Sequence, residues 1–285
     1  MHLWDFPEFF DAGLRKGQNM IKEIIIAAAV IGVLGLAIGL LLGIAAHRFR
    51  VETDEREQKI REALPGNNCG GCGYPGCDGC AAAIASGEAP ADACPVGGAQ
   101  CAAQIAEIIG KSVEPGVSKV AYVACSGTCG KVRTQSIYYG ISDCRAASVT
   151  PGGGERACSY GCMGFGSCVE VCPFDAVHIV DGVAKVDEDK CRACGKCVAI
   201  CPRKLISLVP SNKPYRVACS SRLRGPEVKK QCEAGCIGCG LCAKNCSMGA
   251  ITMVDNLPVF DYDKCANCGS CAGKCPVHVI ASGKD

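Results

Sequence analysis

Cysteines at short, regular intervals are the residues of this chain that could do chemistry. The segment 191–202 has the spacing C-x2-C-x2-C-x3-C-P, which in bacterial ferredoxins binds iron–sulfur cubanes. The first three thiolates of such a run hold one cluster and the fourth reaches the neighbouring cluster, so runs act in pairs. The run recurs from Cys236 and from Cys265. The spacing therefore predicts [4Fe–4S] clusters, which move single electrons.

The number of cysteines narrows the class of protein. Cysteine makes up 27 of 285 residues, which leaves a disulfide scaffold, zinc sites or iron–sulfur clusters. The count is odd, and C-x2-C-x2-C places neighbouring thiols too close to pair well, which argues against disulfides. Zinc sites usually combine two C-x2-C pairs, whereas triplets with a fourth cysteine and a proline favour [4Fe–4S]. Iron is loaded onto reduced thiolates, so we expect a reducing compartment. The formal net charge of +2 gives no reason to propose nucleic acid.

Three clusters have regular sets of candidate ligands, because each takes a triplet and the fourth cysteine of the paired run. The sets are Cys236, Cys239, Cys242 and Cys275; Cys265, Cys268, Cys271 and Cys246; and Cys191, Cys194, Cys197 and Cys172.

The cluster paired with the last of these sets is irregular. Cys162, Cys168 and Cys201 are available to it, but Phe165 occupies the position of the middle cysteine. Cys158 is the natural substitute as fourth ligand, and a three-iron cluster is the alternative.

A different motif near residue 70 predicts a fifth cluster. Its candidate ligands are Cys69, Cys72, Cys77 and Cys94. Glycines at 70, 71, 73 and 76 let the backbone fold tightly and point amides at the cluster sulfur. Short helices within 80–87 and 99–109 are expected to pack on this loop. Cys80 and Cys101, which lie in these helices, are expected to pack rather than to bind the cluster.

Seven cysteines remain after 20 have been assigned to five clusters. Cys125, Cys129 and Cys144 could hold a sixth cluster together with one other cysteine, for which Cys219 and Cys232 are candidates. We therefore expect five [4Fe–4S] clusters, and the sequence leaves a sixth open.

An uncharged stretch predicts a membrane anchor. Residues 24–46 contain no charged or strongly polar side chain and would form about 35 Å of helix, enough to cross a bilayer. Residues 1–23 precede it as an interfacial segment. A cleaved signal peptide is the alternative, but its apolar region is usually shorter. Gly35, Gly39 and Gly43 lie along one stripe, which favours close packing with a partner helix, although glycine is common in membrane helices.

Positive charge after the span predicts its orientation. Lysine and arginine are more frequent just after the span than just before it, so the C-terminal side is expected to face the cytoplasm. The reducing compartment that iron–sulfur clusters need agrees with this orientation. The charged segment 47–66 is expected to form a solvated helical stalk.

The remaining chain is expected to contain a four-cysteine domain at 67–110, a connecting segment at 111–157, and ferredoxin-like domains at 158–210 and 211–285. The stretches of roughly 118–210 and 214–285 are imperfect copies, because Val-Ala-Cys and a cassette with the intervals C-x3-C-x5-C-x3-C occur in both. Each copy also contains a predicted hairpin, of which the first turns at Asp181-Gly182. The fold class is α+β, with one N-terminal transmembrane helix, a small helical [4Fe–4S] domain and two two-cluster domains of bacterial ferredoxin type.

The order of these parts resembles the B subunit of the Rnf complex. The resemblance spans almost the whole chain, and its most specific piece is CGGCGYPGC from Cys69 to Cys77, with CPVGG from Cys94. Shorter members have one ferredoxin domain, and this chain resembles the longer form with two. The resemblance implies that Cys69, Cys72, Cys77 and Cys94 bind a cluster.

The resemblance also implies a function. The family belongs to a membrane-bound, ion-translocating ferredoxin:NAD+ oxidoreductase that couples electron flow to export of sodium ions or protons. The chain would be its non-catalytic relay subunit in the cell (inner) membrane. It would take electrons from soluble ferredoxin and pass them to membrane subunits that handle flavin, NAD and the ion. Electrons would arrive at the C-terminal clusters, which lie farthest in sequence from the anchor, and leave through the Cys69–Cys94 cluster.

Two other functions would fit the same cysteine runs. One is a polyferredoxin-type subunit of another membrane redox complex, such as a hydrogenase. The other is a redox sensor that binds clusters without passing electrons on. Rapid re-reduction by ferredoxin only when membrane partners are present would distinguish a relay from a sensor.

Overall fold

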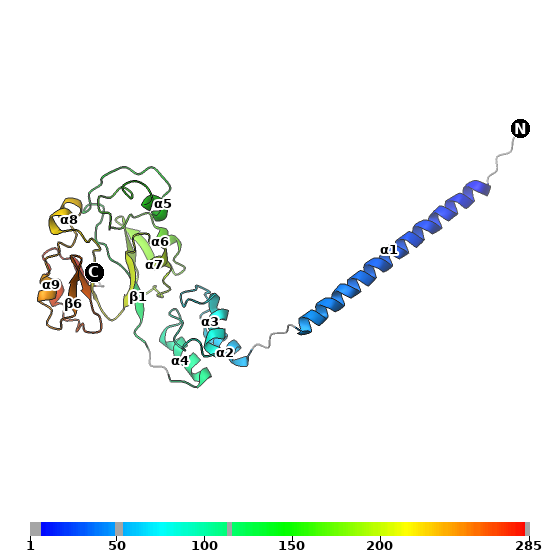
Figure 1. Cartoon of the computed structure of the whole chain (residues 1–285), viewed down its shortest axis with the longest axis horizontal. Helices are drawn as coiled ribbons and strands as arrows, with labels where there is room; N and C mark the ends of the chain where they lie inside the picture. Colours follow the sequence, from blue (N-terminus) through cyan, green and yellow to red (C-terminus); the bar gives the residue numbers. More distant parts are fainter. Residues whose placement is uncertain (1–6, 49–53, 113–115, 283–285) are drawn as a thin grey trace. The chain divides into compact units, whose positions relative to one another are not determined.

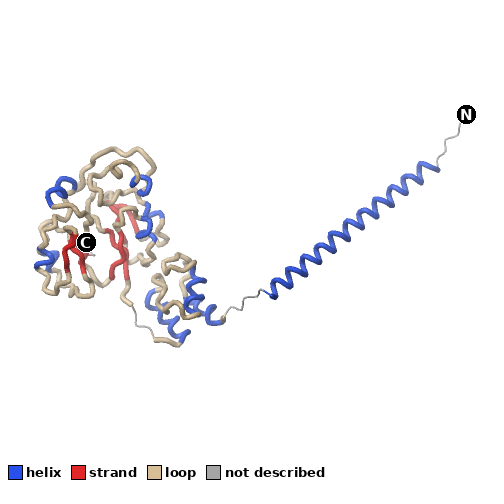
Figure 2. The backbone as a smooth tube through the Cα atoms, viewed as in Figure 1, coloured by secondary structure: helices blue, strands red, loops and turns tan. Residues whose placement is uncertain are grey.

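The computed structural model describes residues 7–48, 54–112 and 116–282 (Figure 1). The chain divides into two compact parts, Met1–Thr53 and Asp54–Asp285. Parts of the expected interfacial segment (1–6), stalk (49–53) and connecting segment (113–115) lie outside the described residues, as do residues 283–285. In the second part, three helices come first along the chain, and short strands interspersed with further short helices follow (Figure 2).

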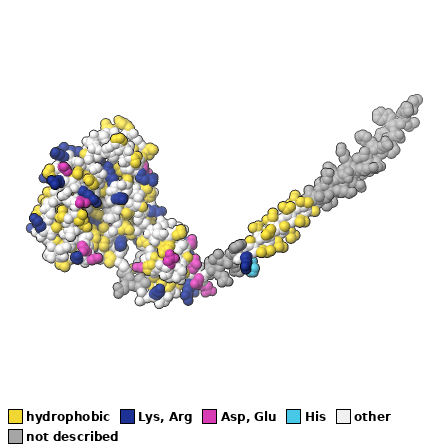
Figure 3. Space-filling model, in the orientation of Figure 1, with side chains coloured by type: hydrophobic (Ala, Val, Ile, Leu, Met, Phe, Trp, Pro, Cys, Tyr) yellow, Lys and Arg dark blue, Asp and Glu magenta, His cyan; other side chains and the backbone are white. Residues whose placement is uncertain are grey.

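The first part of the chain, Met1–Thr53, contains one long helix, α1, Pro7–Arg48. Its segment Ala28–Arg48 has a mean hydropathy of 2.6, and among the described helices it alone is long and apolar enough to cross a membrane. The large apolar side chains from Val30 to Ile44 are exposed, as Figure 3 shows in yellow. A Cβ built on Gly35, Gly39 or Gly43 meets no atom within 4 Å, so a partner helix on this stripe remains a prediction.

Three helices form the four-cysteine domain: α2 (Glu55–Ala63), α3 (Gly76–Ala85) and α4 (Gly98–Ile109). The Asp54 carboxylate caps α2 by accepting a hydrogen bond from the backbone N–H of Arg56 (3.0 Å). Ile60 and Leu64 lie four residues apart on one face of α2 and are buried against α3 and α4. The predicted solvated stalk is therefore, from residue 54 onward, a helix packed into this domain.

The first ferredoxin-like unit is built from two antiparallel strand pairs and three short helices. β1 (Lys119–Val123) pairs with β4 (Ile206–Pro210), and β2 (Val177–Val180) pairs with β3 (Val183–Val186). The helices are α5 (Cys144–Ser148), α6 (Ser167–Glu170) and α7 (Lys196–Ile200). The predicted connecting segment, 111–157, thus supplies β1. The apolar residues of β1 are buried beside β4, the strand that follows the cysteine run at 191–202.

The second ferredoxin-like unit repeats this plan. β5 (Tyr215–Val217) pairs with β8 (Ile280–Ser282), and β6 (Ile251–Val254) pairs with β7 (Leu257–Phe260). Its helices are α8 (Gly225–Gln231), α9 (Leu241–Lys244) and α10 (Ser270–Gly273). In both units the central hairpin turns through two residues with positive φ: 48° and 74° at Asp181-Gly182, and 47° and 63° at Asp255-Asn256.

A buried arginine joins the two ferredoxin-like units. Arg216, on β5, is 1% exposed, and its guanidinium pairs with the carboxylate of Glu188 from the first unit. It also donates hydrogen bonds to the carbonyl oxygens of Lys213 (3.1 Å) and Pro210 (3.3 Å). The guanidinium carbon lies 5.4 Å from the ring centroid of Tyr122 on β1.

Replacing Arg216 with glutamine is expected to lower the free energy of unfolding by about 2 kcal/mol, because charged hydrogen bonds are lost and Glu188 keeps its charge. The measurement is the urea midpoint for loss of the visible cluster absorbance under anaerobic conditions. Arg222→Gln is the control, since Arg222 pairs with Asp255 at the surface, and we expect a change below about 0.5 kcal/mol. Equal shifts in both variants would contradict a joining role for Arg216.

Candidate iron–sulfur centres

Free thiols gather in fours around small cavities in this structure. All 27 cysteines are free. Nowhere in the described residues do three His, Cys, Asp or Glu side chains come close enough to share a single metal ion. Four of the cavities are instead each lined by four cysteines, and little other polar surface faces them. Four separated sulfur donors around a space fit a cubane cluster, which is larger than one ion.

The fourth cysteine of each run is held by the same backbone hydrogen bond. The N–H four residues further along donates to its Sγ. The distances are 3.4 Å at Cys172, 3.5 Å at Cys201, 3.3 Å at Cys246 and 3.4 Å at Cys275. Such bonds orient the sulfur and stabilise negative charge on it, which raises the reduction potential of a bound cluster.

The regular cysteine sets come together as their spacing predicts. One cavity in the second unit is lined by Cys236, Cys239, Cys242 and Cys275. One cavity in the first unit is lined by Cys172, Cys191, Cys194 and Cys197. In the remaining set, Cys265 and Cys268 lie close enough to Cys271 to raise the pKa of its thiol, which burial raises more strongly. Cys246 packs in the same apolar cluster as Cys271.

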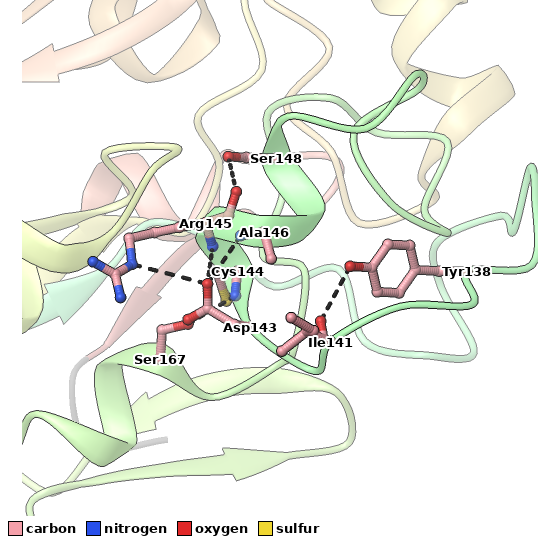
Figure 4. Close-up of polar contacts among 8 residues, drawn as sticks. All are labelled: Tyr138, Ile141, Asp143, Cys144, Arg145, Ala146, Ser148 and Ser167. Atoms are coloured by element: carbon pink, nitrogen blue, oxygen red, sulfur yellow. Dashed lines mark hydrogen bonds and ion pairs between the residues drawn. The ribbon is translucent and has the colours of Figure 1, made fainter.

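The irregular set lies around a cavity together with a residue that the sequence pattern does not indicate. Its cavity is lined by Cys144, Cys162, Cys168 and Cys201, which we call the Cys144 site. Cys144 is the first residue of α5, which Asp143 caps through hydrogen bonds from the N–H groups of Arg145 and Ala146 (both 2.9 Å). The Ser167 hydroxyl donates to Asp143 (2.8 Å) and accepts from the N–H of Cys144 (2.8 Å), which ties α5 to α6 (Figure 4).

The structure therefore differs from the expectation that Cys158 completes this set. Phe165, which replaces the middle cysteine, packs its ring against Tyr138 with centroids 5.2 Å apart. Tyr138 and Cys144 belong to the same long loop, which brings a thiol from outside the run to the cavity. Cys158 instead lines another cavity.

That other cavity lies between the two ferredoxin-like units, and we call it the joint cavity. Its four cysteines are Cys125, Cys158, Cys219 and Cys232. The expected sixth group of Cys125, Cys129 and Cys144 is thus not brought together. Cys129 is exposed and lies near Arg156, whose Nη2 donates to its Sγ at 3.5 Å.

The four-cysteine domain gathers three thiols of its own motif, those of Cys72, Cys77 and Cys94, around Cys80. Asn68 shapes the loop, because its side-chain oxygen accepts a hydrogen bond from the N–H of Cys77 (2.8 Å). The buried thiol of Cys80 lies near Cys72, Cys94 and Cys77, and burial, reinforced by these neighbours, raises its pKa to about 12.

The cysteine predicted to pack in α4, Cys101, lies near Cys94 and Cys77 but makes a hydrogen bond of its own. The Cys101 thiol donates a hydrogen bond to the carbonyl oxygen of Ala63 (3.3 Å), and burial raises its pKa to about 11. A neutral, buried thiol donor is typical of a packing cysteine.

Burial also raises the pKa of many candidate ligands. It raises the pKa of Cys168 to about 12, and those of Cys197, Cys232 and Cys236 to about 11. These thiols are neutral near pH 7 without metal, and each must lose a proton when iron binds. Loading is therefore favoured by higher pH.

The half-buried guanidinium of Arg203 lies near thiols of two groups, Cys158 and Cys162 among them. Arg203 donates from Nη1 to the carbonyl oxygens of Cys158 (2.6 Å) and Gly161 (3.1 Å), and from Nη2 to that of Gly153 (2.5 Å). Burial lowers its pKa, while the nearby thiols, Cys158 and Cys162 first, raise it. Arg203 directly follows Cys201-Pro202. In the second ferredoxin-like unit, Val277 directly follows Cys275-Pro276 and so occupies the equivalent position.

The four-cysteine domain touches the first ferredoxin-like unit at a glycine. A Cβ built on Gly71 would lie 2.8 Å from the carbonyl oxygen and 3.0 Å from the Cα of Cys194. Cys69 is also close enough to Cys194 to raise the pKa of its thiol, although burial is the larger cause. Candidate ligands of two different clusters therefore meet here.

Three family models match separate parts of the chain. They are described as a putative Fe-S cluster family (residues 64–96), an LdpA Fe-S cluster-binding domain (165–212) and a 4Fe-4S dicluster domain (235–279). These matches confirm [4Fe–4S] clusters as the cofactor. Cys125, Cys144, Cys158, Cys219 and Cys232 lie outside all three.

Curated relatives match nearly the whole chain. The B subunit of the Na(+)-translocating ferredoxin:NAD(+) oxidoreductase complex of Acetobacterium woodii is 48% identical over 263 residues, covering 92% of this chain and 79% of the relative. The B subunit of the ion-translocating oxidoreductase complex of Methanosarcina acetivorans is 38% identical over 262 residues, covering 92% and 99%. The chain belongs to the B-subunit family of ion-translocating oxidoreductase complexes.

The name of another member of the B-subunit family specifies protons instead of sodium ions. The B subunit of the proton-translocating ferredoxin:NAD(+) oxidoreductase complex of Clostridium ljungdahlii is 40% identical over 272 residues, covering 93% of this chain and 95% of the relative. Membership in the B-subunit family therefore confirms the Rnf-type resemblance without selecting sodium or protons.

Proposed function

We propose that this chain is the iron–sulfur electron-transfer subunit of a membrane-bound, ion-translocating ferredoxin:NAD+ oxidoreductase complex. It takes electrons from reduced soluble ferredoxin and relays them toward the membrane subunits that handle flavin, NAD and the ion. Each bound [4Fe–4S] cluster accepts and releases one electron. The chain itself holds, orients and insulates these clusters and acts as a relay without its own catalytic residues.

The observation that carries this proposal is a series of contacts between neighbouring thiol groups. The N–H of Cys236 donates to the Sγ of Cys219 (3.3 Å), and the N–H of Cys162 donates to the Sγ of Cys125 (3.4 Å). The series reaches the four-cysteine domain where Gly71 touches Cys194. A relay needs such continuity, whereas a protein that only stores or senses iron does not.

The second ferredoxin-like unit is the end suited to electron uptake. Cys239 and Cys268 are exposed, whereas the cysteines of the Cys144 site are wholly or largely buried. Lysine and arginine outnumber aspartate and glutamate between residues 213 and 274. The exposed Lys264 and Lys274 flank the loop that carries Cys268. Lys264 also pairs with Asp261 (3.0 Å), and it is the net positive charge of residues 213–274 as a whole that favours an acidic one-electron carrier.

The apolar segment of α1 supports a membrane anchor. The reducing environment that free thiols and clusters require supports a cytoplasmic position for the iron–sulfur domains. Electrons would then leave through the four-cysteine domain, which is closest in sequence to the anchor.

The test is anaerobic mixing of the full-length holoprotein with reduced two-cluster ferredoxin, followed by rapid-freeze EPR. We expect the clusters of the second unit to be reduced first and those of the four-cysteine domain later. Clusters that reduced ferredoxin does not reduce at all would overturn the proposal.

Reversing two surface charges is expected to weaken the encounter with ferredoxin. Lys264→Glu combined with Lys274→Glu should lower the second-order rate of reduction roughly tenfold at low salt, with little change at high salt. The measurement is stopped-flow absorbance at several salt concentrations. Lys185→Glu, an exposed position on β3 of the first unit, is the matched control and should change the rate much less. Equal slowing by the control would argue against uptake at the second unit.

A further inference from the structure

Four cysteines outside every ferredoxin-type triplet meet in the joint cavity. Cys125, Cys158, Cys219 and Cys232 line it together with small residues, among them Gly127, Gly161 and Gly235. Cys158 and Cys232 are each 8% exposed. Small neighbours leave room between the thiols, and the cavity has little polar lining apart from serine hydroxyls and one glutamine.

The two ferredoxin-like units contribute equivalent pairs to this cavity. Cys125 and Cys219 each end a Val-Ala-Cys segment that follows β1 or β5. Cys158 and Cys232 each stand four residues before the first cysteine of the following run. The duplicated plan therefore brings two thiols from each copy to one place, which independent packing cysteines would not require.

The polypeptide closes around the cavity from both sides. The Ser126 hydroxyl donates to the carbonyl oxygen of Ala218 (3.0 Å), and the Ser220 hydroxyl donates to that of Tyr160 (2.9 Å). The backbone also pairs across the joint, because the N–H of Arg133 donates to the carbonyl oxygen of Gln231 (2.9 Å). The thiols are thus held in place by contacts of both units.

One buried polar atom at this cavity has no partner. Gln231 lines the cavity, and its side-chain Oε1 is the one buried side-chain oxygen or nitrogen of the described residues without a hydrogen bond. Rotating the amide by half a turn exchanges this acceptor for an N–H donor. A sulfur-rich group in the cavity would supply the acceptor that such a donor needs.

We propose that Cys125, Cys158, Cys219 and Cys232 hold a further [4Fe–4S] cluster that links the two ferredoxin-like units. Assembly exchanges four thiol protons for four iron–sulfur bonds. A hydrogen bond connects this site to a candidate ligand on each side. The N–H of Cys236 donates to the Sγ of Cys219, and the N–H of Cys162 donates to the Sγ of Cys125. Its relay role rests on the proposed function: one electron leaves the second unit, crosses this site and arrives at the Cys144 site, with no other bond made or broken.

Iron and acid-labile sulfide analysis of the anaerobic full-length holoprotein is the first test. With this site loaded, the chain should contain about twenty-four irons, against about twenty without it. Replacing Cys219 and Cys232 together with serine should remove about four irons and four sulfides. Cys129→Ser is the matched control and should remove none. Unchanged iron in the double variant, or about twenty irons in the wild type, would overturn the proposal.

A second measurement separates this site from the function of the whole chain. In the double variant, reduced ferredoxin should still reduce the clusters of the second unit rapidly, while reduction of the first unit should slow at least tenfold. If the variant folds poorly, the wild-type iron count still decides the site, and zinc in place of iron would overturn it. If ferredoxin does not reduce the wild-type clusters, the proposed function is contradicted. The iron count of the wild type then still decides whether the joint cavity holds a cluster.

Discussion

Replacing Cys144 with alanine should convert one [4Fe–4S] cluster of the first ferredoxin-like unit to a three-iron cluster, or remove it. The loss should be between one and four irons per chain, about one if a three-iron cluster forms and about four if nothing assembles. The reason is that Cys144 supplies the thiol that the run lacks at Phe165. The measurement is iron analysis with EPR of the oxidised protein, in which a three-iron cluster gives a signal that an oxidised [4Fe–4S] cluster does not.

The comparison with Cys158→Ala makes this result specific. Cys158 lies in the joint cavity, so its replacement should alter the cluster proposed there and leave the Cys144 site intact, and the iron losses of the two single variants should add in the double variant. A three-iron signal from Cys158→Ala, with normal clusters in Cys144→Ala, would restore the assignment that the sequence alone favours.

Replacing Gly71 with valine should separate the four-cysteine domain electronically from the first ferredoxin-like unit. A Cβ at Gly71 would lie 2.8 Å from the carbonyl oxygen of Cys194, so the two backbones must move apart. Electron tunnelling falls exponentially with distance, and transfer across this contact should slow by an order of magnitude or more. The measurement is rapid-freeze EPR of the cluster in the four-cysteine domain after mixing with reduced ferredoxin.

The control for this effect is Gly116→Ala. A Cβ at Gly116 meets nothing within 4 Å, and its φ is not positive, so this change should leave transfer unaffected. Iron content should stay at the wild-type value in both variants. Lost iron in Gly71→Val would mean that the substitution damages cluster binding itself, and unchanged transfer would contradict a functional contact at Cys194.

Local spacing was sufficient to predict the regular cysteine sets. Three thiols within seven residues can face one cluster only if the chain folds tightly, and the fourth is fixed by an N–H four residues away. Both constraints act within a few residues and are visible in the sequence. The hairpins at Asp181-Gly182 and Asp255-Asn256 could be predicted for the same reason.

Long-range contacts account for what the sequence did not indicate. Cys144 reaches its cavity from a loop 18 residues before Cys162, held by the Asp143–Ser167 hydrogen bond. The joint cavity combines cysteines from both copies, so no spacing within one copy predicts it. The position of α2 depended on only two apolar residues, Ile60 and Leu64, among many charges. The sequence signals for the joint cavity were two duplications, that of Val-Ala-Cys and that of the cysteine four residues before each run.

The difference between Arg203 and Val277 gives the duplicated units unequal affinities for an electron. The half-buried guanidinium of Arg203 favours the additional negative charge of a reduced cluster, whereas a valine at the same place offers no such attraction. We therefore expect the clusters beside Arg203 to have a higher reduction potential than their counterparts beside Val277. Through a single fixed charge, two copies of one plan would become an electron donor and an electron acceptor to each other.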